Sequence, residues 1–343
     1  MSRITLDYLD KSKIEQVYGG TSKVFKISVD SGDYFFKKNY GRHDSERVEK
    51  YFKSQFEDGV DELCADVVEV FSYHFLKEVG VDFCVPYKLA ELDGENGCLS
   101  KSFITDGERM VSILDVMNHN YLFKNGKEVA FDYHTNKEEF EEFYEAYLKD
   151  QKDKNIPYNL SIEGVISDLG QYAKCFGFEF DENSIKKHLA KTMLLDYFMC
   201  NGDRNWTNIK SLVNEKNRSL SLAPLFDNGE CFKMERMVSN KHEDGKVFFH
   251  LGSVVKLKDN TLSNNECVAK QIYSLCSRHE DLRDLLNKCL SLDMAQLITN
   301  VERTEDFLFT KRQKDVIKQA YSEQVASFKK FNPKLDLGFT RED

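Results

Sequence analysis

The sequence predicts an α+β protein with a small β-rich first part that contains one helix, followed by a larger, mainly helical remainder. Segments with the alternating apolar and polar residues of strands are concentrated before about residue 105, whereas helical spacing of apolar residues dominates from about 107 onward. A chain of 343 residues is long enough for two parts that each have a core. We therefore expect two lobes, 1–104 and 105–343.

Composition narrows the classes of function. A hydrophobic content of 41% and an aromatic content of 13% are typical of a globular protein. The net charge of −10 argues against direct binding of nucleic acid or of an anionic membrane. The sequence has no apolar run of membrane-spanning length and no signal-peptide core at its start. Its 9 cysteines include no Cys-x2-Cys pair, so we expect reduced thiols and a cytoplasmic protein.

The first elements are expected in 14–40, as strands on either side of a glycine-rich turn. That turn consists of Tyr18, Gly19, Gly20, Thr21, Ser22 and Lys23. Backbone N–H groups of such a turn can bind phosphate oxygens, and glycine lets the backbone approach closely. We predict that Gly19–Lys23 bind phosphate, with a plain hairpin turn as the alternative.

After a strand over 24–29 and a second turn at 30–33, the strand 34–38 carries two lysines, Lys37 and Lys38, which alternation places on opposite faces. A helix is expected over 63–79, because its apolar residues share one stripe and Gly80 ends it. A lysine on such a strand can neutralise phosphate charge when a helix glutamate holds its ammonium in place. We prefer Lys37 to Lys38 as this lysine, and Glu69 to Glu62 as its partner.

Further strands are expected over 81–92 and 99–104, around a turn at 93–97. The later helices are expected at 160–176, 184–200, 267–277, 280–297 and 312–331, with a further acidic helix at 138–152. Asn183 or Ser184 is the expected cap of the second of these helices. The stretch 232–265 is expected to be a loop with one or two strands.

The most informative motif follows the helix that ends near Cys200. Asp203 is followed by Asn208 five residues later, and a hairpin predicted over 209–226 leads to Asp227. The same spacing recurs by chance, for example at Asp115 and Asn120, but without this context. The hairpin brings Asn208 and Asp227 to one end, where their oxygens can share a magnesium ion that also binds phosphates and water.

These groups occur in the order that kinase-fold phosphotransferases need. Asp203 would take the proton of the acceptor hydroxyl, and Asn208 and Asp227 would hold magnesium on the ATP phosphates. The sequence therefore predicts a two-lobed, protein-kinase-like fold with ATP and Mg²⁺ as cofactors.

A resemblance supports this interpretation. The segments 18–23, 34–37, 69–76, 195–208 and 224–229 are similar, in this order, to those of the HipA-like serine/threonine kinases of bacteria, whose fold is related to the phosphatidylinositol kinases. The resemblance implies Asp203 as the catalytic base, Asn208 and Asp227 as magnesium ligands, Lys37 as the ATP lysine and Glu69 as its partner. It also implies an adenine-binding hinge at Ser102 and Phe103.

The chain departs from the family pattern at three points. Asn205 stands where the family usually has a histidine, and an asparagine cannot carry charge. The glycine-rich turn begins so early that we expect the family's extra N-terminal subdomain to be missing. A separate small antitoxin-like chain is therefore the partner to consider, in a toxin–antitoxin setting. The family's autophosphorylated serine has no single match, and Ser22 and Thr21 are candidates.

Three functions follow from these patterns. The leading one is an ATP- and magnesium-dependent serine/threonine protein kinase that transfers the γ-phosphoryl group to hydroxyls of a protein substrate and of itself. The first alternative is a small-molecule phosphotransferase of the aminoglycoside- or lipid-kinase type, for which the acidic stretch 138–145 would supply a pocket. The second is a non-catalytic pseudokinase module, although retention of Lys37, Asp203, Asn208 and Asp227 argues against it.

Overall fold

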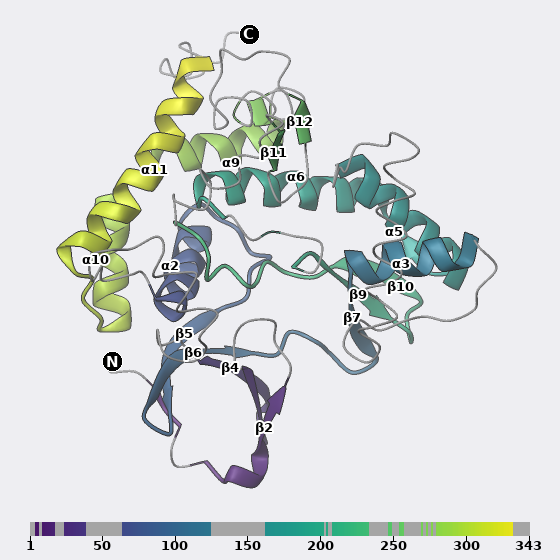
Figure 1. Ribbon diagram of the computed structural model, residues 1–343, viewed down its shortest axis with the longest axis horizontal. Helices are drawn as coiled ribbons and strands as arrows, with labels where there is room; N and C mark the ends of the chain where they lie inside the picture. The colour runs from purple at the N-terminus through teal and green to yellow at the C-terminus, as the bar shows by residue number, and fades with distance from the viewer. Residues whose placement is uncertain are drawn as a thin grey trace.

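The structure is a computed structural model of the whole chain (Figure 1). It describes residues 4–6, 9–17, 24–38, 64–124, 162–201, 204, 208–232, 246–248, 254–256, 269, 272–273, 276 and 279–331. Strands dominate the first part of the chain and helices the rest, so the predicted α+β class is confirmed. Within these residues, no helix combines the length and apolar composition that crossing a bilayer requires.

A six-stranded sheet, the N-terminal sheet, forms the first part of the fold in the order β1-β5-β6-β4-β3-β2. Its strands are β1 (Ile4–Thr5), β2 (Ile14–Val17), β3 (Val24–Val29), β4 (Gly32–Lys38), β5 (Tyr87–Leu92) and β6 (Glu95–Lys101). β1 pairs in parallel with β5, and the other neighbours are antiparallel. A short 3-10 helix, η1 (Lys11–Lys13), precedes β2. The expected strands around the glycine-rich turn are therefore present, while the turn itself, 18–23, lies outside the described residues.

The hairpin β5–β6 differs from the expected one at both ends. β5 begins at Tyr87 rather than 81, because the chain before it pairs with a distant segment through a bridge between Cys84 and Leu225. β6 begins at Glu95 rather than 99, because Asp93 and Gly94 alone make the turn, with φ angles of 51° and 76°. β6 then runs beside β4 as far as Lys101.

The helix expected over 63–79 is α2 (Ala65–Glu78), which packs on β5 and β6. Its buried stripe includes Phe71 and Phe75, whose rings contact Phe232, Phe309 and Tyr321 in later parts of the chain. His74 Nε2 lies 2.8 Å from Glu305 Oε1 at the end of α10. The helix is therefore held by the sheet on one side and by the helical part on another.

A second sheet has the order β7-β9-β10-β8. Its strands are β7 (Glu108–Ser112), β8 (Glu179–Phe180), β9 (Lys210–Asn214) and β10 (Ser219–Leu222). β9 and β10 are the predicted hairpin. β7 was expected to lie in a helical region, but it pairs with β9 instead, a contact between segments distant in sequence that local periodicity does not register. A small third sheet pairs β11 (Lys246–Phe248) with β12 (Val254–Lys256), within the stretch expected to hold one or two strands.

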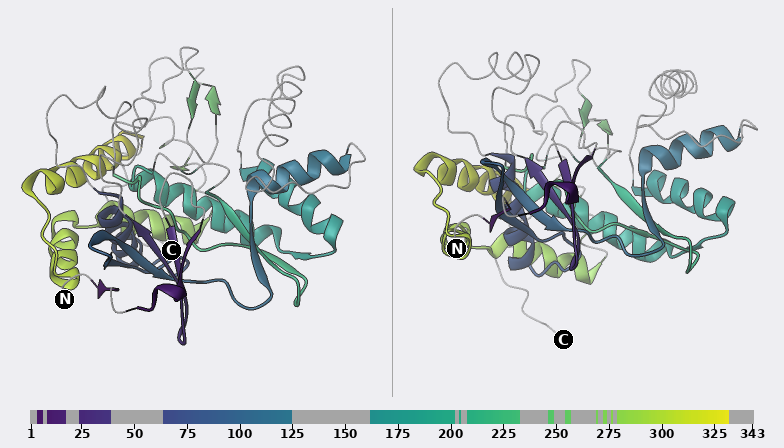
Figure 2. Two further views of the ribbon diagram at one scale, coloured as in Figure 1. Left: turned by 60° about the horizontal axis from the view of Figure 1, so that its bottom comes forward. Right: turned by 90° about the horizontal axis from the view of Figure 1, so that it is seen from below.

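The helices of the second part are α3 (Ile113–Lys124), α5 (Ile162–Phe176), α6 (Glu182–Phe198), α9 (Glu280–Ser291), α10 (Met294–Glu305) and α11 (Lys311–Phe331). Figures 1 and 2 show α10 and α11 at one end of this part and α3 and α5 at the other, with α6 between them. Of the helix expected at 267–277, residues 269, 272–273 and 276 are described and helical. The acidic stretch 138–152 lies outside the described residues.

Two helix boundaries correct the sequence-based expectation. The cap of α6 is Asp181, not Asn183 or Ser184, and its carboxylate accepts the N–H of Ser184 at 3.1 Å. The helix expected over 280–297 is two helices, because Asp293 caps α10 by accepting the N–H of Gln296 at 3.0 Å. In both helices, the aspartate that accepts a backbone N–H three residues later marks the start of the helix better than the apolar spacing does.

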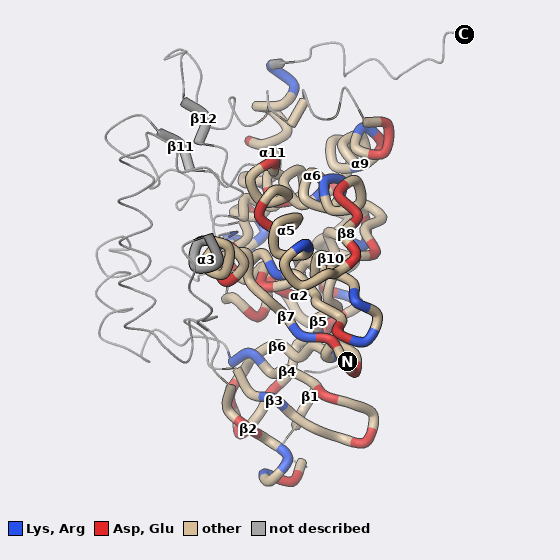
Figure 3. The backbone as a smooth tube through the Cα atoms, turned by 90° about the vertical axis from the view of Figure 1, so that its right-hand side faces the viewer, with Lys and Arg blue, Asp and Glu red and all other residues tan. Residues whose placement is uncertain are grey.

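One large hydrophobic cluster runs from α2 through α6 to α11. Its fully buried members include Phe71, Phe75, Tyr197, Phe198 and Phe328. A separate small cluster of Leu6, Ile27, Phe36, Ala90 and Leu92 lies in the N-terminal sheet. Figure 3 shows acidic and basic residues interspersed along the elements rather than segregated by sign.

Candidate active site

Lys37 lies where the N-terminal sheet, helix α2 and the loop after β10 meet. Its Nζ donates a hydrogen bond to Glu69 Oε1 at 2.8 Å and a second one to the carboxylate of Asp227. These three residues were selected from the sequence, in which 32 and 190 positions separate the two carboxylates from the lysine. The structure brings them together around one ammonium group.

Lys38 points to the opposite face of β4, as strand alternation requires. Its Nζ lies 3.1 Å from Glu95 Oε1, a half-exposed carboxylate at the start of β6. The two adjacent lysines therefore differ completely in surroundings, and Lys37 is the one that faces Glu69. Glu62, the alternative partner, lies outside the described residues.

The charged groups at this junction shift the pKa values of one another. Burial opposes the ammonium of Lys37, but the carboxylates of Glu69 and Asp227 outweigh it and raise the pKa of Lys37 well above its usual value. Burial is also the largest influence on Asp227, yet the charge of Lys37 overcomes it and lowers the pKa of the Asp227 carboxyl. Burial raises the pKa of Glu69, against the pull of Lys37. Lys37 is therefore a permanent cation, and Asp227 keeps its negative charge.

The turn that carries Asp227 is tied to α2. Asp227 has a φ of 57°, in the left-handed region, and the next residue, Asn228, donates its N–H to Glu69 Oε2 at 2.7 Å. A Cβ on Gly229 would lie 3.2 Å from Ala65 Cβ at the start of α2, a tighter contact than most side chains make. Glu69 thus holds Lys37 with one oxygen and the Asp227 turn with the other.

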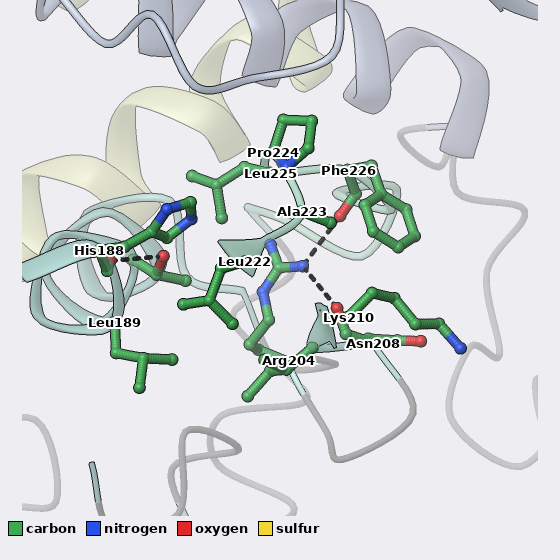
Figure 4. Close-up of a pocket in the computed structure, with 12 residues that line it drawn as sticks. His188, Leu189, Arg204, Asn208, Lys210, Leu222, Ala223, Pro224, Leu225 and Phe226 are labelled. Carbon is green, nitrogen blue, oxygen red and sulfur yellow. Dashed lines mark hydrogen bonds between the residues drawn. The ribbon is translucent and has the colours of Figure 1, made fainter. Parts of the chain in front are cut away.

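Arg204 links the loop after α6 to the same turn. Its guanidinium contacts both carboxylate oxygens of Asp196, at 3.1 Å from Nε to Oδ2 and 3.2 Å from Nη2 to Oδ1. Nη2 also donates to Asn228 Oδ1 at 2.6 Å. Nη1 donates to the carbonyl oxygens of Phe226 at 2.8 Å and Asn208 at 3.4 Å (Figure 4). Sequence reasoning assigned no role to Arg204, because a buried arginine cannot be distinguished from a surface one by spacing alone.

Asn208 lies beside Phe226 and Lys210 at the lip of a small pocket (Figure 4). Asn208 and Asp227 therefore stand at the same end of the β9–β10 hairpin, as expected, and Arg204 touches the backbone on both sides of that end. Three other residues of the predicted loop, Asp203, Asn205 and Trp206, lie outside the described residues. The assignment of Asp203 as a base stays a prediction.

Comparison with solved structures identifies the architecture. The chain matches the Helicobacter pylori proinflammatory kinase CtkA with a TM-score of 0.54 and 12% sequence identity, over 98% of this chain and 99% of that one. The chain has a kinase fold. It also matches HipA of the Shewanella oneidensis MR-1 toxin–antitoxin system, solved with HipB and operator DNA, with a TM-score of 0.45 and 8% identity over 100% of this chain and 69% of that one.

No protein-family model and no curated protein sequence matches the chain. At this level of identity, the likeness concerns the fold. The kinase fold expected from the sequence is confirmed at that level.

In a kinase fold, the segment after the N-terminal sheet connects the two lobes. Here Ser102 continues from β6 and donates its N–H to the carbonyl of Asp33 at 2.8 Å. The ring of Phe103 lies 5.8 Å from that of Phe226, the residue before Asp227. The predicted hinge therefore borders the same junction as Lys37, and its role in adenine binding stays a prediction.

The residues at this junction fit a nucleotide-bound divalent cation. Asp227 and Asn208 offer a carboxylate and an amide oxygen, the hard donors that magnesium prefers. Within the described part of the chain, no three His, Cys, Asp or Glu side chains gather to bind a metal by themselves. A cation held here would therefore take its remaining ligands from water and from phosphates, beside the ammonium of Lys37.

The pocket behind Asn208 has a volume of about 20 Å³, enough for a water molecule. His188 of α6 lines it, and its ring centroid lies 4.4 Å from that of Phe83. Burial lowers the pKa of His188 to about 4, and the charges of Lys191 and Arg204 act in the same direction. The imidazole is therefore neutral at physiological pH.

Proposed function

We propose that this chain is an ATP- and magnesium-dependent phosphotransferase of the HipA-like type that phosphorylates serine or threonine hydroxyls of proteins. The observation that carries this proposal is the placement of Lys37 between Glu69 and Asp227 in a kinase fold. A buried ammonium held by two carboxylates is poised to neutralise phosphate oxygens, because Asp227 can pass to a metal ion while Glu69 keeps the lysine in place.

Each residue has a role in this proposal. The magnesium nucleotide, when bound, would supply the phosphoryl group, and the metal would offset the negative charge of the phosphate oxygens. Asn208 and Asp227 would hold the metal, and Lys37 would bind the phosphates. The carboxylate of Asp203 would accept the proton of the acceptor hydroxyl. Gly19–Lys23 would cover the phosphates, while Ser102 and Phe103 would border the adenine.

Three further parts of the proposal concern organisation and setting. We propose a lobe boundary between 104 and 105, a position between β6, which ends at Lys101, and β7, which begins at Glu108. The acceptor would be a protein, and the kinase itself is one candidate through Thr21 or Ser22. A small antitoxin-like chain would be the partner, in the cytoplasm.

The test uses two adjacent lysines as matched variants. Purified protein is incubated with Mg-ATP, and its intact mass is compared with that of Lys37→Met, Lys38→Met and Asp203→Ala. We expect the unsubstituted protein and Lys38→Met to gain phosphate, and the other two to lose the gain. Lys37→Met removes the cation that would bind the phosphates, and Asp203→Ala removes the general base, which lowers the rate by about 10²–10⁴-fold. Equal phosphorylation of all four proteins would contradict the assigned site.

If no protein gains mass, the kinase does not phosphorylate itself, and nucleotide binding is measured instead. Stabilisation of the unsubstituted protein by Mg-ATP in a thermal melt, absent in Lys37→Met, would then indicate a kinase whose acceptor is another protein or a small molecule. Absence of any Mg-ATP effect would favour the non-catalytic module and contradict the proposal.

A further inference from the structure

Arg204 is one of the most enclosed charged residues of the structure, with 2% of its surface exposed. It comes directly after the predicted base, yet its guanidinium points into the protein and contacts groups from four places in the chain. Arginine presents several N–H donors in a rigid fork, so one side chain can fix several acceptors at set angles. What it fixes here is the surroundings of the two predicted metal ligands.

The hydrogen bonds of Arg204 reach groups next to both predicted metal ligands, Asp227 and Asn208. Nη1 holds the carbonyl oxygen of Phe226, directly before Asp227, and Nη2 holds the side chain of Asn228, directly after it. Nη1 also reaches the carbonyl oxygen of Asn208. Arg204 therefore restrains the peptide groups to which both predicted ligands are attached.

The other half of the fork is anchored on α6. Asp196 accepts from Nε and Nη2, and its Oδ1 also accepts from Asn201 Nδ2 at 3.0 Å. Asp196 is fully buried, and burial raises the pKa of its carboxyl against the opposing charge of Arg204. The pair therefore joins the end of α6 to the end of the β9–β10 hairpin.

The hydrogen bonds of Arg204 are also linked to Lys37 through Asn228 and Glu69. Asn228, held by Arg204 through its side chain, donates its backbone N–H to Glu69, and Glu69 accepts from Lys37. Lys37 in turn donates a hydrogen bond to the carboxylate of Asp227. Contacts thus run without interruption from Asp196 to the predicted phosphate lysine and back to the predicted metal carboxylate.

The energetics favour a geometric role over a stabilising one. Burying two opposite charges costs several kcal/mol per ion, of which their attraction returns only part, so apolar residues of similar volume are often at least as stable. A buried pair placed between a helix end and the metal turn is therefore better explained by the positions it fixes. Groups that orient metal ligands from behind commonly change metal affinity when they are replaced.

We propose that Arg204 is a positioning residue that presets Asn208 and Asp227 for a divalent cation and thereby determines the metal affinity of the site. The proposal rests on the proposed phosphotransferase function. It separates two quantities, since the nucleotide can still bind through Lys37 and the hinge when the metal ligands are misplaced. Loss of Arg204 should therefore weaken metal binding while metal-free nucleotide binding persists.

The experiment compares Arg204→Lys with Arg218→Lys, in a chain otherwise unchanged. Arg218 serves as the control. It lies at the opposite end of the β9–β10 hairpin and also donates to backbone carbonyls, those of Phe176 and Gly177. Binding of a non-hydrolysable ATP analogue is measured by calorimetry without metal, and Mn²⁺ binding to the analogue-loaded protein is measured by electron paramagnetic resonance.

We expect Arg204→Lys to raise the Kd of Mn²⁺ by about 10- to 100-fold, the usual scale for such supporting residues. The metal-free Kd of the analogue should change by less than about twofold, and Arg218→Lys should leave both constants as they are. Equal weakening of both constants by Arg204→Lys, or unchanged Mn²⁺ binding, would overturn the inference. A lack of metal-dependent analogue binding in the unsubstituted chain would overturn the proposed function as well.

A second variant protects the test against misfolding. Asn228→Ala removes one acceptor of Nη2 but leaves the ion pair of Arg204 with Asp196 and the backbone N–H that Glu69 accepts. Weaker Mn²⁺ binding with intact metal-free binding in this variant supports the inference, and unchanged Mn²⁺ binding counts against it. Circular dichroism establishes that each variant is folded before the constants are compared.

Discussion

Single residues at the junction of sheet, helix and hairpin show how adjacent identical side chains come to differ. Lys37 and Lys38 have the same chemistry and the same strand, but alternation turns one toward Glu69 and the other toward Glu95. The charge environment of the first is fixed by two carboxylates, whereas the second forms a partly exposed pair of small energetic value. Position along the strand thus decides which lysine faces Glu69, and this is the lysine that we propose binds phosphate.

His188 gives a test of the structure that is independent of catalysis. Its pKa of about 4 in the folded protein lies below the usual 6.5, mainly because it is buried. The unfolded chain takes up the proton near pH 6.5 and the folded chain resists it until about pH 4, so stability present above pH 6.5 is lost as the pH falls. The loss attributable to this group is up to about 3 kcal/mol.

Urea denaturation of the unsubstituted protein and of His188→Gln at pH 7 and near pH 4.5 measures this effect. The free energy of unfolding of His188→Gln should fall less between the two pH values, because glutamine does not titrate. Parallel falls in the two proteins would show that His188 is protonated as easily in the folded state as in the unfolded one.

At the scale of elements, the helix start signals matter as much as the apolar spacing. α6 begins at an aspartate that accepts a backbone N–H, and α10 begins in the same way. An N-cap of this type satisfies a donor that the first helical turn leaves open. The same helix carries Asp196, the carboxylate that accepts from Arg204, near its other end.

Replacing this cap should therefore destabilise the protein measurably. Asp181→Ala removes the acceptor of the Ser184 N–H and should cost about 1 kcal/mol of unfolding free energy. Glu182→Ala is the control, since this exposed residue is acidic in the same first turn but does not cap it. Denaturation curves of the two variants should differ, and an equal shift would mean that general charge at the helix end, rather than capping, is responsible.

The elements also show what sequence reasoning could reach. Periodicity and turn residues are local signals, and they predicted α2, α6 and the β9–β10 hairpin. The start of β5 depends on the pairing of Cys84 with Leu225, and β7 depends on β9, so distant partners decided both. The network of Arg204 was missed for the same reason, because its acceptors come from separate segments and burial cannot be read from a charge in a sequence.

On the scale of the whole molecule, burial is unevenly shared. The large cluster includes α2, α6, α11 and one face of β5 and β6, whereas β3 and β4 contribute their buried residues to the separate cluster of five. Regions with fewer buried apolar contacts open more readily to solvent. The sheet and the helical part should therefore differ in local stability even though α2 belongs to the larger core.

Hydrogen exchange monitored by mass spectrometry tests this difference. Peptides covering β3 should exchange sooner than peptides covering α6, because β3 rests on the small cluster and α6 lies inside the large one. Both elements are hydrogen-bonded along their length, so the comparison reports opening rather than missing bonds. Simultaneous exchange of the two would indicate that the molecule opens only as one unit.

The attachment of α2 on two sides limits how this site can be blocked by small molecules. Glu69 is bound to the Asp227 turn, and His74 on the same helix contacts Glu305 of α10, so an outward shift of α2 would break both contacts at once. Compounds that need space behind Lys37 would have to displace the helix, whereas compounds confined to the nucleotide side would leave it in place. Inhibitor screens against the proposed nucleotide site should therefore favour compounds that leave α2 in place over those that displace it.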